Sequence, residues 1–377
     1  MRILLTKYSP QSEPKLVIAF TSSPLQLSDL TSVSIIKVIS SICSSKKMKP
    51  ITHLFTAPAN AMGSLSGLLS TQSALKLGAW VLTALALIGT ARSEIFISNI
   101  SEGSGRIASY STSGALINAS VVSGFSNSDI PFVLSGTSLF VSDYPQNAIR
   151  KYTTSGTLVD ANFISGLPDH PGNLAVAGSD LFVTHINGPF SQVGSYTTSG
   201  ATTNAALISA GLFNPFGIAV SGPNLYIANY GGSNTIGKYD SATGNLIETM
   251  SISGLTSMTS IAISGSNLYV LDIASSTIGA YDITTGVAVN ANLISGLISP
   301  MGMAISGSSL YVTSYNGDGS NGIVGEYTLA GDTINATLIS GLNSPYYIAI
   351  GAIPEPSTSA ALAGAAMLGL AMRRRRA

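Results

Sequence analysis

The chain has 377 residues, of which 17 are basic and 17 acidic, so its formal net charge is zero. This balance conceals an acidic central region, because residues 94–351 contain four cations and fourteen acids. Such a region is unsuited to binding nucleic acid, and because the only cysteine, Cys43, precedes it, it has no disulfide, zinc–thiolate site or thiol nucleophile.

The N-terminal segment, residues 1–61, is expected to be a non-structural extension or the product of a misassigned start. Residues 1–47 are polar and show no helical or strand periodicity. Translation would then begin at Met48 or Met62.

Residues 62–93 have the order of a secretory signal peptide. Lys76 precedes an apolar run over residues 77–89, and the small residues Gly89 and Ala91 follow it. This order predicts a short hydrophobic helix and cleavage after Ala91 or Ser93. An uncleaved membrane anchor is the alternative.

The central region is built from a repeat of about 43 residues. Its marker is a glycine followed by Leu, an aromatic residue and Val or Ile, and the spacing between successive markers is 42 to 44 residues. The five marker glycines are Gly136, Gly178, Gly222, Gly265 and Gly307. Such a period indicates a circular or solenoid array. Each unit contains four short runs rich in Val, Ile, Tyr, Phe and Thr, bounded by turn residues, which predicts four strands per unit.

The two ends of the repeat region are incomplete and complementary. Residues 95–97 correspond to the second strand of a unit, whereas residues 347–350 supply one additional first strand. Together they complete a sixth unit. The sequence therefore predicts an all-β, six-bladed β-propeller over residues 94–351, closed by strands from both termini.

Within the repeat, residues 215–229 and 236–239 resemble an NHL-type propeller repeat. Repeats of this type usually carry Asp or Asn directly after the second strand. The six residues at that position form a possible ligand-binding ring: Asn99, Asp143, His185, Asn229, Asp272 and Ser314. Alternatively, these side chains hydrogen-bond nearby backbone and shape the turns. Tyr144, Tyr230 and Tyr315 follow the ring in alternate blades, where they could stack on sugar rings or pack between blades.

Two enzyme classes share the propeller fold and provide the competing hypothesis. Gluconolactonase-type propellers hold a divalent metal with Glu, Asn and Asp in the channel, and streptogramin-lyase-like propellers use His and Glu. Among the residues that lead into the first strands, only Asn173 has a suitable type, and His170 and His185 are the only histidines of the region. We therefore predict no catalytic residue, no metal and no cofactor, and keep a lactonase or lyase as the alternative.

The C-terminal segment, residues 352–377, resembles a PEP-CTERM sorting tail. A Pro-Glu-Pro motif precedes an apolar run over residues 360–372 and a cluster of arginines; the motif residues are Pro354, Glu355, Pro356, Arg373, Arg374, Arg375 and Arg376. The resemblance implies an exosortase-type processing enzyme as partner and transient anchoring in the inner membrane by a short hydrophobic helix. An anchor that is never processed is the alternative.

Together these patterns predict an exported protein of the cell envelope or extracellular space. We expect a binding or structural module of the envelope or exopolysaccharide matrix, with extracellular polysaccharide as a possible partner and no nucleic acid.

Overall fold

The computed structural model describes residues 92–353, except 102–103, 127–129, 188–189, 231–234, 253 and 316–320. The predictions for residues 1–61, for residues 62–91 of the signal peptide and for the sorting motif at Pro354–Pro356 and Arg373–Arg376 fall outside the described residues. Both predicted terminal helices therefore lie there too. Among the described residues, no helix is long and apolar enough to cross a membrane.

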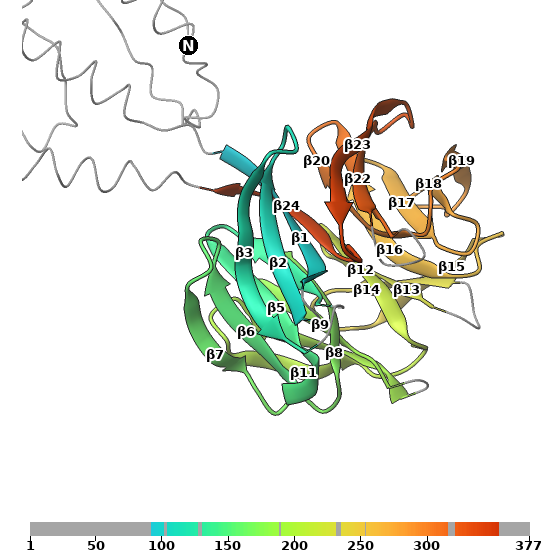
Figure 1. The fold of residues 1–377 in the computed structure, drawn as a ribbon. Coiled ribbons are helices and arrows are strands. Elements are labelled where there is room, and N and C mark those ends of the chain that lie inside the picture. Colours follow the sequence, from blue (N-terminus) through green and yellow to red (C-terminus); the bar gives the residue numbers. More distant parts are fainter. Residues whose placement is uncertain are drawn as a thin grey trace, which may run out of the picture. The chain divides into compact units, whose positions relative to one another are not determined.

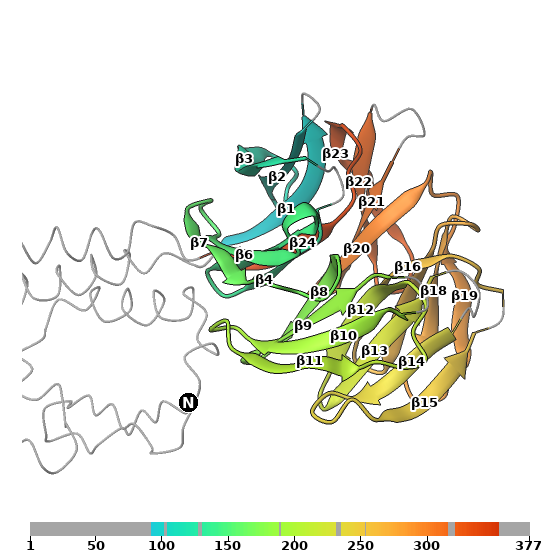
Figure 2. The same ribbon diagram turned by 90° about the horizontal axis from the view of Figure 1, so that it is seen from below.

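The described residues form six four-stranded antiparallel sheets, which follow one another around a common centre in chain order (Figures 1 and 2). The prediction of an all-β, six-bladed propeller is confirmed. Blades 1 to 3 comprise β24 (Ile348–Ile353), β1 (Arg92–Ser101), β2 (Ser104–Ser111) and β3 (Leu116–Phe125); β4 (Phe132–Ser135), β5 (Ser138–Asp143), β6 (Ala148–Thr153) and β7 (Leu158–Ile164); β8 (Pro171–Ala177), β9 (Asp180–His185), β10 (Gln192–Thr197) and β11 (Thr202–Ile208).

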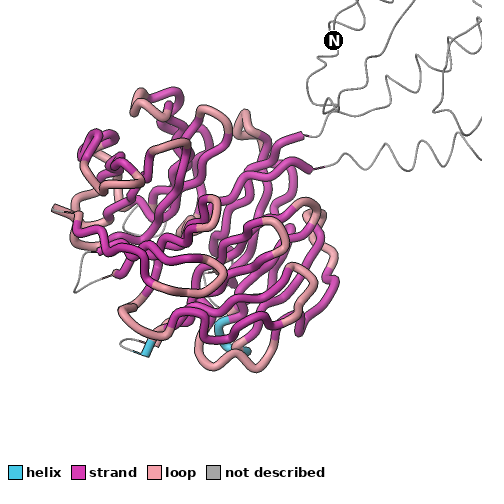
Figure 3. Tube along the Cα trace, turned by 180° about the vertical axis from the view of Figure 1, so that it is seen from behind, coloured by secondary structure: helices cyan, strands magenta, loops and turns pink. Residues whose placement is uncertain are grey.

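Blades 4 to 6 repeat the same plan. They comprise β12 (Pro215–Ser221), β13 (Asn224–Asn229), β14 (Thr235–Asp240) and β15 (Leu246–Ser251); β16 (Met258–Ser264), β17 (Asn267–Asp272), β18 (Thr277–Asp282) and β19 (Ala288–Ile294); β20 (Pro300–Ser306), β21 (Ser309–Ser314), β22 (Gly322–Thr328) and β23 (Thr333–Leu342). Most of the described backbone is strand, and loops, turns and short helical turns connect the strands, as Figure 3 shows.

Strands from the two ends of the region close the ring. β24 pairs antiparallel with β1 from Arg92 opposite Ile353 to Ile97 opposite Ile348. The red β24 and the cyan β1 lie side by side in Figure 1. The predicted closure is confirmed, and these two strands extend two residues beyond the predicted limits, 94 and 351, at each end. Pairing both strands within one sheet leaves neither as a free edge inside the ring.

The hydrophobic core lies between neighbouring blades. The aromatic residue of each repeat marker is buried and packs on the next blade; Tyr226, for example, shares a cluster with Leu268 and Val270 of blade 5. The turn between first and second strands depends on the marker glycine, because Gly222 has φ +56°, a left-handed conformation that glycine adopts without strain.

A second recurrent contact explains the tyrosine of the third strand in blades 3 to 6. In blade 3 the ring of Tyr196 lies over Gly194, so close that a Cβ at Gly194 would sit 2.7 Å from the ring. Blades 4 to 6 repeat this contact with Gly237, Gly279 and Gly325. Burial raises the pKa of Tyr196 to about 12. The glycine is therefore required by close packing rather than by backbone conformation.

Candidate functional site

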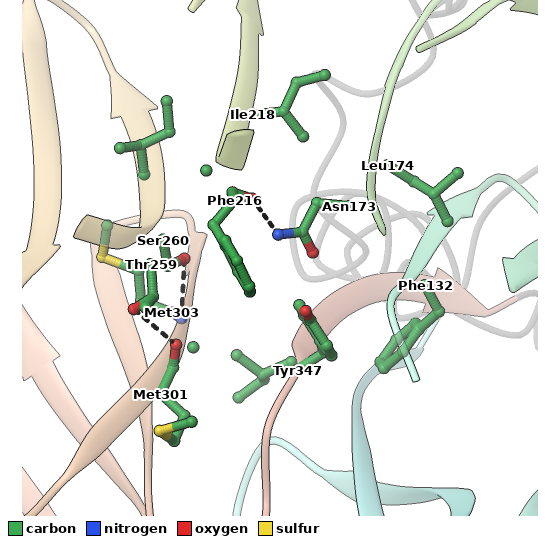
Figure 4. Close-up of a pocket in the computed structure, with 14 residues that line it drawn as sticks. Phe132, Asn173, Leu174, Phe216, Ile218, Thr259, Ser260, Met301, Met303 and Tyr347 are labelled. Atoms are coloured by element: carbon green, nitrogen blue, oxygen red, sulfur yellow. Dashed lines mark hydrogen bonds between the residues drawn. The ribbon is translucent and has the colours of Figure 1, made fainter. Parts of the chain in front are cut away.

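The first strands of all six blades line a central channel. At the end where these strands begin, which we call the channel mouth, they surround a cavity of about 110 Å³. Each blade contributes to its lining, with Phe132, Asn173, Phe216, Thr259, Met301 and Tyr347 as one residue from each (Figure 4).

Polar groups at the mouth join neighbouring blades. The side-chain amide of Asn173 donates to the carbonyl oxygen of Phe216 in the next blade, and Thr259 Oγ1 donates to the carbonyl oxygen of Met301 over 3.3 Å (Figure 4). Thr313 Oγ1 makes the equivalent bond to the carbonyl oxygen of Tyr346, over 2.7 Å, at the junction that closes the ring. These bonds satisfy buried polar groups and fix the spacing of the blades around the mouth.

The described part of the lining carries no carboxylate and no imidazole. Asn173, the one candidate that the comparison with lactonase-type propellers provided, lies in the cavity, but its amide is engaged with Phe216. In the described residues, no group of three or more His, Cys, Asp or Glu side chains could hold a metal ion. The lining thus presents apolar surface, hydroxyl groups and one amide.

The six residues of the possible ligand-binding ring are all buried. Asp143 accepts a hydrogen bond of 2.6 Å from Arg150 Nε, and the Arg150 guanidinium carbon lies 5.2 Å from the centroid of the Phe125 ring in blade 1. A buried carboxylate needs a cation or several hydrogen-bond donors, because an unpaired charge is strongly destabilised away from water, and Arg150 supplies the cation for Asp143.

Asn229 and Asp272 hold the loops that precede their blades. Asp272 Oδ1 accepts a bond of 2.7 Å from the backbone N–H of Ser257, and Asn229 Oδ1 accepts one of 3.0 Å from that of Phe213. Ser314 is buried at the end of β21. The side chains of Asn229 and Asp272 thus each position the loop that leads to the mouth in their blade.

Two buried nitrogens of the ring, Asn99 Nδ2 and His185 Nδ1, have no hydrogen-bond partner among the residues that the structure describes. Asn99 Oδ1 accepts from Arg106 Nε over 2.9 Å, and His185 Nε2 lies 3.4 Å from the Tyr196 hydroxyl. Burial lowers the pKa of His185 to about 4, although the backbone of Asp169 partly opposes the shift. The imidazole is therefore neutral at pH 7.

Three aromatic pairs lie at the mouth end of the blades. Tyr144 stacks on His170 with ring centroids 3.9 Å apart and an interplanar angle of 16°. The other pairs are Phe216 with Tyr230, at 5.1 Å, and Tyr315 with Tyr346, at 6.2 Å. Each pair joins the residue after a second strand to a residue at the start of a first strand.

The aromatic pairs alternate around the ring. The residue that follows each ring position is tyrosine in blades 2, 4 and 6 and isoleucine in blades 1, 3 and 5: Tyr144, Tyr230 and Tyr315 against Ile100, Ile186 and Ile273. The sequence identified the three tyrosines, but not His170, Phe216 and Tyr346 as their partners. The sequence signal that could have identified these partners is their position, just before or at the start of a first strand.

Comparison with known proteins concerns the tail and the fold. Residues 352–376 match the family model described as the PEP-CTERM protein-sorting motif. This motif is a sorting signal recognised by an exosortase, and it marks an exported protein that is sorted to the cell envelope. No curated protein matches the chain in sequence. A chain in a crystal structure of a nidogen/laminin complex is similar at 16% identity and a TM-score of 0.53, covering 70% of this chain and 99% of that chain. At this identity the likeness concerns the propeller fold alone.

Proposed function

We propose that this exported, envelope-sorted propeller is a binding or structural module that binds polysaccharide of the extracellular matrix at its channel mouth. The observation that carries the proposal is the set of three aromatic pairs on alternate blades around one mouth. The assignment of the blades as NHL-type repeats is part of the same proposal and rests on the sequence pattern.

The chemistry of the mouth suits a sugar chain. A tyrosine offers a flat apolar face and a hydroxyl group, which match the C–H face and the polar edge of a sugar ring. Tyr144 is 42% exposed, so part of its surface is open to solvent beside His170. Because the pairs recur around the ring, one polysaccharide chain could contact more than one of them. Such multivalent contact raises the overall affinity above that of a single pair.

The direction of the closing strand is compatible with this role. All first strands begin at the mouth and run to the opposite end of the blade. β24 therefore begins near the mouth, and its last residue, Ile353, lies at the opposite end. The sorting motif begins at Pro354, the next residue. The mouth is thus at the end of the blades away from the point where the tail leaves.

We further propose that an exosortase-type enzyme cleaves at or near Pro354–Pro356 after residues 360–372 have anchored the chain transiently in the inner membrane. The motif match supports this step. Intact mass of the exported protein is the test, because protein that still contains Arg373–Arg376 would contradict cleavage.

The binding proposal is tested by titrating the exported protein with purified matrix polysaccharide. We expect Tyr144→Ala, Tyr230→Ala and Tyr315→Ala each to weaken binding about tenfold, which corresponds to about 1.4 kcal/mol. Leu246→Ala, on the exposed side of β15, is the matched control and should bind as the wild type does. A triple tyrosine variant that is folded and keeps wild-type affinity would contradict the proposal.

A lactonase or lyase of the kinds considered from the sequence would need carboxylates or histidine at the channel. The described lining supplies neither, and His185 is buried and neutral at pH 7. We therefore propose binding in preference to hydrolysis or elimination.

A further inference from the structure

We propose that Asn335, on the outer rim of blade 6, is an N-glycosylation site. Its side-chain amide is the acceptor for a saccharide carried on a polyprenyl diphosphate donor. The site lies on the outer edge of the sheet and is independent of polysaccharide binding at the channel mouth. It requires only that the chain is exported, as the sorting motif indicates.

The sequence pattern that marks such sites, Asn-x-Ser or Asn-x-Thr without proline at x, occurs three times in the chain. Asn99, in the first copy, is fully buried, and its Oδ1 accepts a hydrogen bond from Arg106. Asn118, in the second copy, is only partly exposed. In the third copy, residues 335–337 are all exposed, so this copy is the one that a transferring enzyme can reach.

The third copy lies on a bulge at an open strand edge. β23 is the last strand in the sheet of blade 6, and Figure 2 shows it on the outside of the ring. Its pairing with β22 shifts register on both sides of the Glu326–Asn335 pair. Asn335 Oδ1 accepts a bond of 3.1 Å from the backbone N–H of Thr337, which holds the two residues of the pattern together. Asn335 Nδ2 has no hydrogen-bond partner among the described residues and is free to react.

Blade 5 presents the same geometry without the hydroxyl group. Asn290 is exposed at the equivalent position of β19, and its Oδ1 accepts a bond from the backbone N–H of Asn292 over the same distance, 3.1 Å. Enzymes that transfer saccharides to asparagine need serine or threonine two residues further on. The bond that shapes the bulge is thus common to both blades, and Thr337 is the residue that distinguishes blade 6.

The transfer forms a carbon–nitrogen bond. Asn335 Nδ2 attacks the anomeric carbon of the first sugar, the bond from that carbon to the diphosphate oxygen breaks, and polyprenyl diphosphate leaves with the electron pair. The nitrogen loses one proton to a base of the transferring enzyme. Nothing is oxidised or reduced. The product is still an amide with Oδ1 as acceptor, so the bond from the backbone of Thr337 is compatible with the modification.

The test is mass spectrometry of the full chain, exported by its native host and digested with a protease that cleaves after tyrosine and phenylalanine. Such a protease is needed because no lysine or arginine lies between Lys238 and Arg373. It releases residues 328–346, with Asn335, and residues 282–311, with Asn290. We expect a glycan on Asn335, located by fragmentation of the peptide, and none on Asn290.

Three variants isolate the cause. Thr337→Asn gives blade 6 the pattern of blade 5 and should abolish the modification of Asn335, whereas Thr337→Ser should retain it. Asn292→Thr gives blade 5 the pattern of blade 6 and should add a glycan to Asn290. A circular dichroism spectrum like that of the wild type shows that each variant is folded.

Four results would overturn the inference: an unmodified Asn335 in the wild type, a Thr337→Asn variant that is still modified at Asn335, a glycan attached to Thr337 itself, or a folded Asn292→Thr variant with no glycan on Asn290. Titration with matrix polysaccharide tests binding at the mouth separately, so failure of one proposal is not mistaken for failure of the other.

Discussion

Exposed apolar side chains occur both at the channel mouth and on the outer rim, which consists of the fourth strands β3, β7, β11, β15, β19 and β23. At the mouth end the exposed residues include aromatics outside the strands, such as Tyr144 and Phe190. On the rim they are aliphatic and lie on strands, for example Leu158 and Leu246. The mouth therefore offers flat rings for recognition, whereas the rim offers apolar residues on sheet edges, which a protein must protect from association.

The rim carries a recurrent device that interrupts its edges. Asn118 Oδ1 accepts a bond of 2.9 Å from the backbone N–H of Ser120, and the pairing of β2 with β3 shifts register at this point. Four other blades repeat the side-chain bond with Asp160, Asn204, Asn290 and Asn335. Bulges of this kind twist an edge away from regular pairing. The comparison thus separates the mouth, for which we propose glycan binding, from a rim whose strand edges are interrupted by bulges.

The largest effect is expected from the buried charge near the mouth. Arg150→Met would leave Asp143 buried without its cation and should lower the free energy of unfolding by about 4 kcal/mol. Asp160→Asn, on the exposed rim, keeps the accepting oxygen and should change stability little. Denaturant unfolding of the two variants measures the contrast. Equal stabilities would show that the mouth pair is not structurally important.

The next largest effect concerns pH. The pKa of His185 is lowered from 6.5 to about 4 in the folded state, so the unfolded state binds the proton first as the pH falls. The neutral His185 side chain contributes about 3 kcal/mol to the free energy of unfolding above about pH 6.5. This contribution is lost as the pH falls from that value to about 4.

Unfolding measured against pH tests this contribution. The His185→Leu variant should have a flatter stability profile between pH 6.5 and pH 4 than the wild type. Identical slopes in this window would contradict the assignment of the effect to His185.

A smaller effect is expected on the rim. Asn290→Val removes the acceptor for the backbone N–H of Asn292 and should cost about 1 kcal/mol. Because the bulge would be weakened, we also expect more self-association in sedimentation experiments. Asn290→Asp preserves the acceptor and is the control. An Asn290→Val variant that self-associates no more than the wild type would show that the bulge does not protect the edge.

The smallest effect is expected at an exposed aliphatic side chain of the rim. Leu246, which is 57% exposed, should tolerate replacement by Asn within about 0.5 kcal/mol of unfolding free energy. Its polysaccharide affinity should equal that of the wild type. A loss of affinity comparable to that of the tyrosine variants would show that the rim, rather than the mouth, binds the glycan.

The number of blades and their closure could be predicted from the sequence because their signals are local. A turn glycine such as Gly222 and its neighbouring apolar run lie within a few residues of one another, and their repetition defines the unit. Gly194 and Tyr196 are also close in sequence, but their contact could not be predicted. Only the folded structure shows that the tyrosine ring lies over the glycine.

The candidate site was only partly predictable, because its partners come from separate segments. Tyr315 is visible in the sequence as part of an alternating pattern, whereas its neighbour Tyr346 comes from the loop before β24. At the closing junction, the backbone N–H of Tyr347 donates to Ser98 Oγ, 249 positions away, over 2.9 Å. Sequence periodicity by itself determined the ring of six blades. Tertiary packing decided which polar residues are buried and which aromatics meet at the mouth, because both depend on contacts between distant segments.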